Sequence, residues 1–270
     1  MARNISLRWM LMSIAFALFV ADVSGQSPAA TLAPTGTLRA VFLGGNPVQG
    51  RVDAKTGDLS GTVPDLVREL ATRLKVPVSI VSAPNAGAVI GALNDGKADI
   101  GFLAYDEERS REVDFGPAFV VMQNSYLVKA TSPIKASADV DREGVTVAAV
   151  KGQTQEHFVS ATMKRARVRV LDAMPPQAEV DKLLTSGDVH AFAINRQRSL
   201  EAEAAAGGRL RALPDSFLDV EQCFVVAKGN AGRLTAIDQF VGDMRASGFI
   251  KQSIDRARLV GVSVAPVRKR

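Results

Sequence analysis

Short apolar runs alternate with amphipathic segments along most of the chain, and this alternation predicts an α/β fold. Apolar runs bounded by turn residues are typical of buried strands, whereas apolar residues spaced three and four apart are typical of helices. The first half of the chain predicts strands at 37–43, 76–82 and 98–104, with helices at 61–74 and 85–95 between them. This order predicts a parallel-rich sheet covered by helices.

The clearest helix pattern lies at 61–74. Its apolar face is formed by Leu66, Val67, Leu70 and Leu74. Thr62 and Asp65 stand three residues apart, which is the spacing of a capping box, so we expect Thr62 to cap the helix.

The alternation restarts near residue 145 and predicts a second unit. Its strands are expected at 145–150, 167–171 and 189–194. One helix is expected after Gly152. Another is expected to carry Val180, Leu183 and Leu184 and to end at Gly187, because glycine commonly terminates helices. Two such units predict two lobes.

Two extended runs, 125–130 and 223–228, bracket the second unit and are expected to cross between the lobes. We therefore assign 36–127 and 226–266 to the first lobe and 128–225 to the second. The chain ahead of them, 26–35, is rich in Pro, Ala and Thr and is expected to be a flexible leader. An amphipathic helix is expected to return to the first lobe, with Leu234, Ile237, Phe240, Val241 and Met244 facing inward.

The N-terminal segment has the pattern of a secretory signal. Arg3 and Arg8 precede an apolar run, Trp9 to Ala21, which is too short to cross a bilayer, and small residues follow it. Cleavage is expected near Gly25, giving a signal peptide at 1–25 and a periplasmic protein. No cysteine follows the run, so lipid attachment is not expected. The alternative is an uncleaved membrane anchor.

Charge and rare residues narrow the chemistry. The formal net charge of +5 is spread along the chain, which argues against nucleic-acid binding. Cys223 is the only cysteine, so no internal disulfide can form, and its apolar run predicts a buried thiol. His157 and His190 show no metal-ligand spacing, so neither metal nor cofactor is expected. We expect His190 in the core and Glu156 at the surface.

Several stretches together resemble a known family. They are GTLRAVF, TGDLSGTVPDLVRELATRL (56–74), ALNDGKADIGF (92–102), DEERSREVDFGPAF (106–119) and VTVAAVKGQTQEHF (145–158). In this order and spacing, they resemble the periplasmic solute-binding proteins of the amino-acid type, which serve ABC importers. The resemblance extends from Gly36 to about Pro266.

The resemblance implies a type II periplasmic binding protein fold. In it, two α/β lobes joined by two hinge crossings close on a small ligand. By the same resemblance, Arg109 would grip a ligand carboxylate, and Gln153 and Thr154 would contribute from the second lobe. A guanidinium matches the geometry of a carboxylate, and a helix start attracts anions, so the chemistry of these residues suits the roles.

The sequence departs from the family pattern where amino-acid ligands are usually held. Asn195 stands where an aspartate commonly pairs with the ligand's α-amino group, and Val63 replaces another common acid. The remaining candidates for the cleft wall are Phe102, Ala104 and Tyr105. An unpaired ammonium is costly to bury, so the departures favour an organic acid, or an amino acid held by unusual contacts. The ligand is thus expected to be anionic or zwitterionic. Arg196 is a candidate for a second acidic group.

Two other functions stay open. An enzyme of the same fold, such as a dehydratase, would need a well-placed general acid in the cleft, and Asp106, Glu107 and Glu108 lie near Arg109. A ligand sensor for a membrane partner has the same sequence features as a transport protein. For transport, the expected partner is an ABC permease in the inner membrane, and family analogy predicts a monomer.

Overall fold

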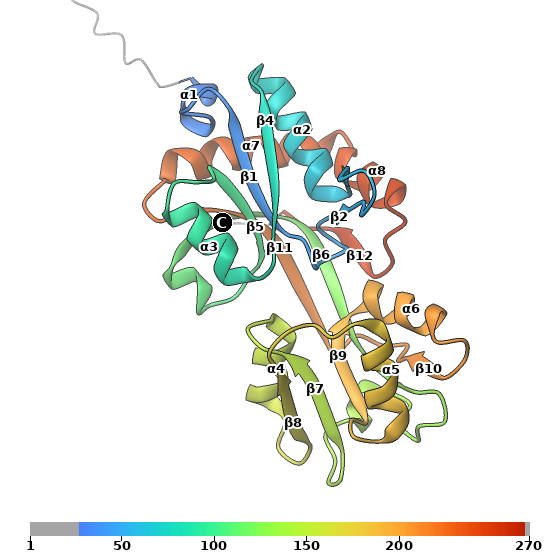
Figure 1. Cartoon of the computed structure of the whole chain (residues 1–270). Coiled ribbons are helices and arrows are strands. Elements are labelled where there is room, and N and C mark those ends of the chain that lie inside the picture. Colours follow the sequence, from blue (N-terminus) through green and yellow to red (C-terminus); the bar gives the residue numbers. More distant parts are fainter. Residues whose placement is uncertain (1–26, 268–270) are drawn as a thin grey trace, which may run out of the picture.

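The computed structural model describes residues 27–267, which form two lobes stacked end to end (Figure 1). The segment predicted as a signal peptide, 1–25, lies outside the described residues, as does the first residue of the predicted leader. Among the helices of 27–267, none combines the length and the apolar character that a bilayer crossing requires.

The first lobe, at the top of Figure 1, is built on parallel strands. β1 (Leu38–Leu43) lies between β4 (Val78–Ala83) and β5 (Ile100–Ala104) and pairs parallel with both. The helices of this lobe are α1 (Pro28–Leu32), α2 (Thr62–Leu74), α3 (Ala86–Asn94), α7 (Ala231–Ala246) and α8 (Phe249–Arg256). Shorter strands are β2 (Arg51–Val52), β3 (Leu59–Ser60) and β12 (Val262–Val264).

The second lobe repeats this arrangement on a smaller scale. β7 (Thr146–Val150) lies between β8 (Arg167–Leu171) and β9 (Ala191–Asn195) and pairs parallel with both. Its helices are α4 (Thr154–Thr162), α5 (Gln177–Ser186) and α6 (Arg196–Ala205), and β10 (Leu210–Ala212) completes the sheet. Short 3-10 turns are formed by η1 (Arg109–Arg111) in the first lobe and η2 (Ser137–Asp139) in the second.

Two long antiparallel strands join the lobes. β6 (Val113–Lys129) pairs with β11 (Leu218–Ala227) over its first part and with β9 over its last part. The change of partner falls at Asn124, which is opposite both Leu218 and Asn195. The buried Asn124 side chain donates to the Leu218 carbonyl at 2.9 Å and accepts from Gln155 Nε2 of the second lobe at 2.6 Å. The crossing is therefore held by side chains as well as by the strands.

Each lobe has its own apolar core. The first lobe packs α2, α7 and α8 on one face of its sheet, around the buried rings of Phe42, Phe102, Phe119, Phe224 and Phe240. α3 covers the other face with Val89, Ile90 and Leu93. In the second lobe, α5 packs Val180, Leu183 and Leu184 against one face of the sheet, and α4 packs against the other.

Most predicted elements are present, and the exceptions have clear causes. Thr62 was expected to cap α2, but its hydroxyl donates to the Val48 carbonyl at 2.6 Å, and Gly61 precedes the helix without a side-chain cap. Where a flexible leader was expected, α1 buries Leu32 in the first core. His190 was expected in the core, but it is exposed at the start of β9, and its Nδ1 accepts from the Thr146 amide at 3.0 Å. Cys223 is buried, as predicted.

Candidate functional site

The two lobes close around a small cavity. Its volume is about 40 Å³, and it is lined from the first lobe, the crossing strands and the second lobe. The polar lining side chains are Asn46, Gln49, Arg109, Gln153, Thr154, Gln155, Asn195, Arg198 and Gln222. Among the described residues that line it, two are arginines and none is an aspartate or a glutamate. The cavity is therefore electropositive.

Arg109 enters the cavity from the first lobe. η1 and the preceding turn hold its backbone, whose amide donates to Asp106 Oδ1 at 3.2 Å. Its guanidinium spans the lobes, because Nη1 donates to the Ala104 carbonyl at 3.1 Å and Nη2 to the Gly152 carbonyl at 2.7 Å. Burial lowers the pKa of Arg109, although the nearby carboxylates of Asp106 and Glu108 oppose this shift. Three of the five N–H donors of a guanidinium remain for another acceptor.

The second lobe meets Arg109 with the start of α4. Gly152 has a φ of +69°, a conformation that side chains disfavour, and this turn directs its carbonyl to Arg109. Gln153 is the N-cap and Thr154 the first helical residue, and both line the cavity. Glu156 is half-buried rather than at the surface, because it reaches back to the Gly152 amide at 3.1 Å.

The start of α6 forms another wall of the cavity. Asn195 is its N-cap and accepts from the Arg198 amide at 2.9 Å, so the amide side chain fixes the first turn. Arg198 then lines the cavity, and burial lowers the pKa of its guanidinium. Arg196 points elsewhere, because its Nη1 donates to the Pro214 carbonyl at 2.8 Å. The arginine of α6 that faces the cleft is therefore Arg198.

Two hydrogen-bonded side-chain amides, those of Gln49 and Gln222, supply one more donor. The Leu43 amide donates to Gln49 Oε1 at 2.9 Å, and Gln49 Nε2 donates to Gln222 Oε1 at 2.9 Å. This sequence of bonds leaves Gln222 Nε2 as a buried donor with no hydrogen-bond partner among the residues that the structure describes. Gln222 lines the cavity, so a ligand can supply the missing acceptor.

The cavity has a wider neighbour. A pocket of about 470 Å³ shares Leu43, Arg109, Gln153, Met174 and Arg198 with it. This larger pocket lies between the start of α3 in the first lobe and the β7–α4 turn of the second, and it adjoins the cavity at the residues that the two share.

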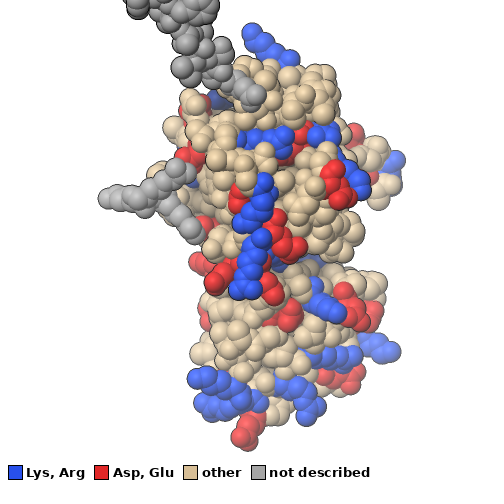
Figure 2. Space-filling model, turned by 90° about the vertical axis from the view of Figure 1, so that its left-hand side faces the viewer, with Lys and Arg blue, Asp and Glu red and all other residues tan. Residues whose placement is uncertain are grey.

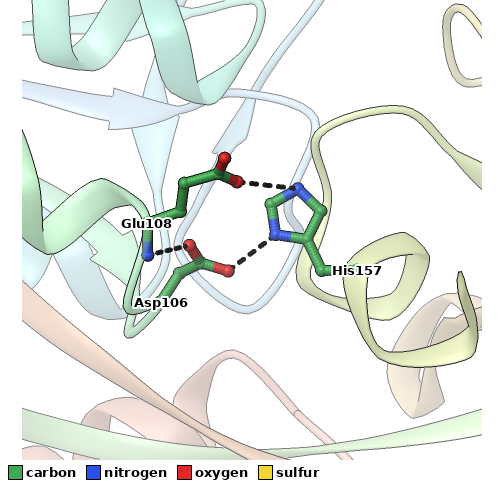
Figure 3. A group of neighbouring side chains, drawn as sticks. All are labelled: Asp106, Glu108 and His157. Carbon is green, nitrogen blue, oxygen red and sulfur yellow. Dashed lines mark hydrogen bonds and ion pairs between the residues drawn. The ribbon is translucent and has the colours of Figure 1, made fainter. Parts of the chain in front are cut away.

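A hydrogen bond between the lobes lies beside Arg109. His157 of α4 points between two carboxylates of the first lobe, with Nδ1 2.8 Å from Asp106 Oδ2 and Nε2 4.0 Å from Glu108 Oε2 (Figure 3). The ligating atoms lie within 4.8 Å of one another, but the acids approach opposite ring nitrogens. Because Asp106 Oδ2 lies at hydrogen-bond distance from Nδ1, the group as it stands is a hydrogen bond and ion-pair contact between the lobes.

An ion pair also lies across the lobes at α6, on the opposite side of the cleft in Figure 1. Arg51 of β2 pairs with Glu201 of α6, and Gln197 Nε2 holds the same carboxylate at 2.6 Å. Figure 2 shows acidic and basic side chains mixed where the lobes meet on the α4 side. The closed arrangement is thus bracketed by polar contacts on both sides.

The structure brings most of the predicted site residues together. Arg109, Gln153, Thr154, Asn195 and Ala104 line one cavity. Phe102 is instead fully buried in the first core, packed between Phe119 and Phe224. Tyr105 is 41% exposed and lines a different pocket, next to Phe115.

Sequence reasoning missed Arg198 and Gln222. Arg198 stands three residues after the cap Asn195, so it occupies the first turn of a helix that begins at the cleft. That spacing is a usable signal, because the first turn of a helix that follows a parallel strand faces the ligand crevice. Gln222 lies in the middle of a crossing strand, and no local pattern distinguishes it from a surface residue.

The chain is similar to known proteins over most of its length. The sequence profile of the bacterial extracellular solute-binding proteins, family 3, matches residues 40–257. A glutamine-binding protein of Geobacillus stearothermophilus is 32% identical over 112 residues, which are 39% of this chain and 41% of that protein. The L-cystine-binding protein TcyJ of Escherichia coli K12 is 23% identical, covering 72% of this chain and 73% of that protein.

A solved structure shares the fold. It is a binding component of an ABC transporter from Wolinella succinogenes DSM 1740, complexed with lysine. Its TM-score is 0.71 at 24% identity, covering 82% of this chain and 95% of that chain. Likeness at this identity shows the two-lobed fold rather than a shared ligand.

Proposed function

Because the chain belongs to family 3 of the bacterial extracellular solute-binding proteins, we propose that it binds one small carboxylate-bearing solute between its lobes. The solute is then delivered to an ABC importer. One observation carries this proposal: Arg109 is buried between the lobes, touches both of them, and keeps donors free toward the cavity.

In this proposal, a carboxylate binds to the free edge of the Arg109 guanidinium and to the start of α4. A planar guanidinium offers paired donors that match the two oxygens of a carboxylate. Gln153 and Thr154 add donors from the opposite lobe. Their helix start carries a partial positive charge, which favours an anion.

Ligand binding and lobe closure are coupled in this arrangement. The Arg109–Gly152 bond and the Asp106–His157 bond exist only while the lobes are together. A ligand held by Arg109 on one side and by Thr154 on the other adds contacts that the open form lacks. It therefore shifts the population toward the closed form, which is the form that a transporter can distinguish.

The ligand class follows from the relatives and from the cavity. The relatives are named for glutamine and L-cystine, and the solved structure holds lysine. These ligands all carry a carboxylate, which is the group that Arg109 suits. For this chain we propose an amino acid or an organic acid. The signal pattern at 1–25 supports a periplasmic location, and the family analogy supports a monomer.

Binding without chemistry is favoured over catalysis. The family and the named relatives are binding proteins. A dehydratase would need a general acid or base beside the ligand. The described residues that line the small cavity offer guanidinium, amide and hydroxyl groups, while the nearest carboxylate of the arginine turn, Asp106, is bonded to His157.

The test uses ligand-induced stabilisation. The protein is screened by thermal shift against amino acids and organic acids, because a ligand that binds only the folded state raises Tm. The variant R109Q should abolish the largest shift. The matched control is R111Q, which removes an exposed arginine from the same turn and should retain the shift. A full shift in R109Q would refute the role of Arg109.

A further inference from the structure

The cavity holds two positive charges and no carboxylate, and we propose that its ligand is a small dicarboxylate without an α-ammonium group. One carboxylate would bind Arg109 and the other would bind Arg198. This inference rests on the proposed function. It adds that the ligand carries a second carboxylate and no α-ammonium group. It is carried by Arg198, Asn195 and Gln222, which have no part in the assignment of Arg109.

Arg198 is a half-buried residue whose guanidinium makes no hydrogen bond or salt bridge to any described residue, and its attraction to Glu201 is opposed by the charge of Arg51. Its backbone is fixed by Asn195, so the side chain projects from a defined point of α6 into the cleft. The acid that attracts Arg198, Glu201, is already shared by Arg51 and Gln197. A desolvated cation without a hydrogen-bonded partner is costly, and an anion from outside removes that cost.

The cavity also offers no charged acceptor for an ammonium group. Asn195, which replaces the expected aspartate, uses its side-chain oxygen to accept the Arg198 amide. Two other amide oxygens of the lining are committed in the same way. Asn46 Oδ1 accepts the Val48 amide at 3.1 Å, and Gln49 Oε1 accepts the Leu43 amide. An α-ammonium would therefore lose its water without gaining a carboxylate.

Donors remain where these acceptors are occupied. Gln222 lines the cavity, and its Nε2 is buried and lacks an acceptor among the described residues. Together with the free donors of Arg109 and Arg198, it gives a lining that matches ligand oxygens. A second carboxylate supplies acceptor oxygens and also neutralises the second guanidinium, which a neutral side chain cannot do.

The size of the cavity favours a short ligand. A cavity needs roughly 10–15 Å³ to hold one water by this measure of volume. The cavity of about 40 Å³ thus has room for only a few heavy-atom groups before its wider neighbour begins. Aliphatic dicarboxylates between malonate and adipate fit this description, with the second carboxylate placed where the two pockets meet at Arg198.

The experiment is isothermal titration calorimetry with malonate, succinate, glutarate and adipate. Valerate serves as the monocarboxylate and glutamate as the same diacid with an α-ammonium. We expect at least one dicarboxylate to bind more tightly than valerate by about 30-fold or more, since a close charge pair removed from water can contribute a factor of this size. Tighter binding of glutamate than of every dicarboxylate, or no binding of any dicarboxylate, would overturn the proposal.

Two variants test whether Arg198 is the residue that favours dicarboxylates over valerate. R198Q should weaken the best dicarboxylate by about 30-fold or more and leave valerate within about threefold. R196Q removes a charge from the same helix but not from the cavity, and should leave both unchanged. An R198Q protein that binds the dicarboxylate as well as wild type overturns the proposal. If R109Q alone leaves all binding intact, the proposed function fails instead.

Discussion

Two regions join the lobes: the cavity, and the contact of His157 with Asp106 and Glu108 beside it, which we call the rim. They differ in whether positive and negative groups of the protein pair with one another. In the cavity, Arg109 and Arg198 face a lining without carboxylates. At the rim, one imidazole, that of His157, lies between Asp106 and Glu108. At the rim, the charged groups find partners within the protein. In the cavity, hydrogen-bond donors and positively charged groups lack such partners among the described residues.

This difference assigns different roles to the two regions. A contact whose hydrogen-bonding and charged groups pair with one another can hold the lobes together whether or not a ligand is present. A cavity with unpaired donors is stable only at a cost, and that cost is recovered when an anion enters. The rim therefore sets how readily the lobes meet, and the cavity sets which molecule keeps them together.

The largest expected effect on ligand selectivity comes from placing a carboxylate in the cavity. Asp caps helices as well as Asn does, so N195D should keep the start of α6 intact. The new carboxylate would pair with an α-ammonium and repel a dicarboxylate. We expect the affinity for glutamate relative to glutarate to rise about 100-fold, or about 2.7 kcal/mol. Calorimetric titration of both ligands measures the ratio.

The control for N195D is N195S, which keeps a capping oxygen without the charge. Its glutamate-to-glutarate ratio should stay close to that of wild type. An equal change in N195S and N195D would show that the cap, and not the charge, controls selectivity, and the contrast between cavity and rim would lose its basis.

Local patterns in the sequence were sufficient for much of the fold. β8 begins and ends as predicted, at 167–171, and α5 ends at Gly187 in a left-handed conformation because both depend on neighbouring residues only. Thr62 shows the limit of such patterns. Its spacing from Asp65 suits a cap, but a tertiary acceptor, the Val48 carbonyl, takes its hydroxyl.

The site was predictable only in part, because facing directions are set by tertiary structure. Arg196 and Arg198 are two residues apart, which is about 200° around a helix, so they point to opposite sides. Which one faces the cleft depends on how α6 lies on its lobe. His157 and Asp106 are 51 residues apart, and only lobe closure brings them together.

At the rim, the next largest effect is expected from D106N. The Asp106 side chain is 8% exposed and accepts from His157 and from the Glu108 and Arg109 amides. Burial opposes its ionisation, but these hydrogen bonds and the charge of Arg109 hold its pKa below the ordinary 3.8. Losing this charge should lower the free energy of unfolding by about 2 kcal/mol at pH 7. Urea denaturation measures the loss.

The pH dependence gives D106N its own check. A carboxylate with a lowered pKa in the folded state contributes stability above its unfolded pKa, and that contribution is lost as pH falls through the folded pKa. The gap between wild type and D106N should therefore narrow as pH falls below about 4. A gap that does not narrow over this range would contradict the role of the Asp106 carboxylate.

A smaller effect, of the opposite sign, is expected from R198M in the ligand-free protein. Methionine keeps much of the side-chain volume and removes the unpaired charge. The free energy of unfolding should rise by about 1 kcal/mol in urea denaturation, while the stabilisation by a dicarboxylate disappears. R196M is the matched variant and should not be stabilised, because Arg196 has an acceptor in the Pro214 carbonyl. A loss of stability in R198M would show that Arg198 is satisfied without ligand.

The smallest effect is expected from E108Q. This variant separates the contribution of Glu108 to the rim from that of Asp106. Glu108 is 76% exposed and lies 4.0 Å from His157 Nε2, whereas Asp106 is largely buried and within hydrogen-bond distance of Nδ1. Solvent screens an exposed pair, so E108Q should change the free energy of unfolding by less than about 0.5 kcal/mol, and salt should reduce even this change. An effect as large as that of D106N would mean that both carboxylates hold the imidazole equally, and that the rim depends on net negative charge instead of one buried hydrogen bond.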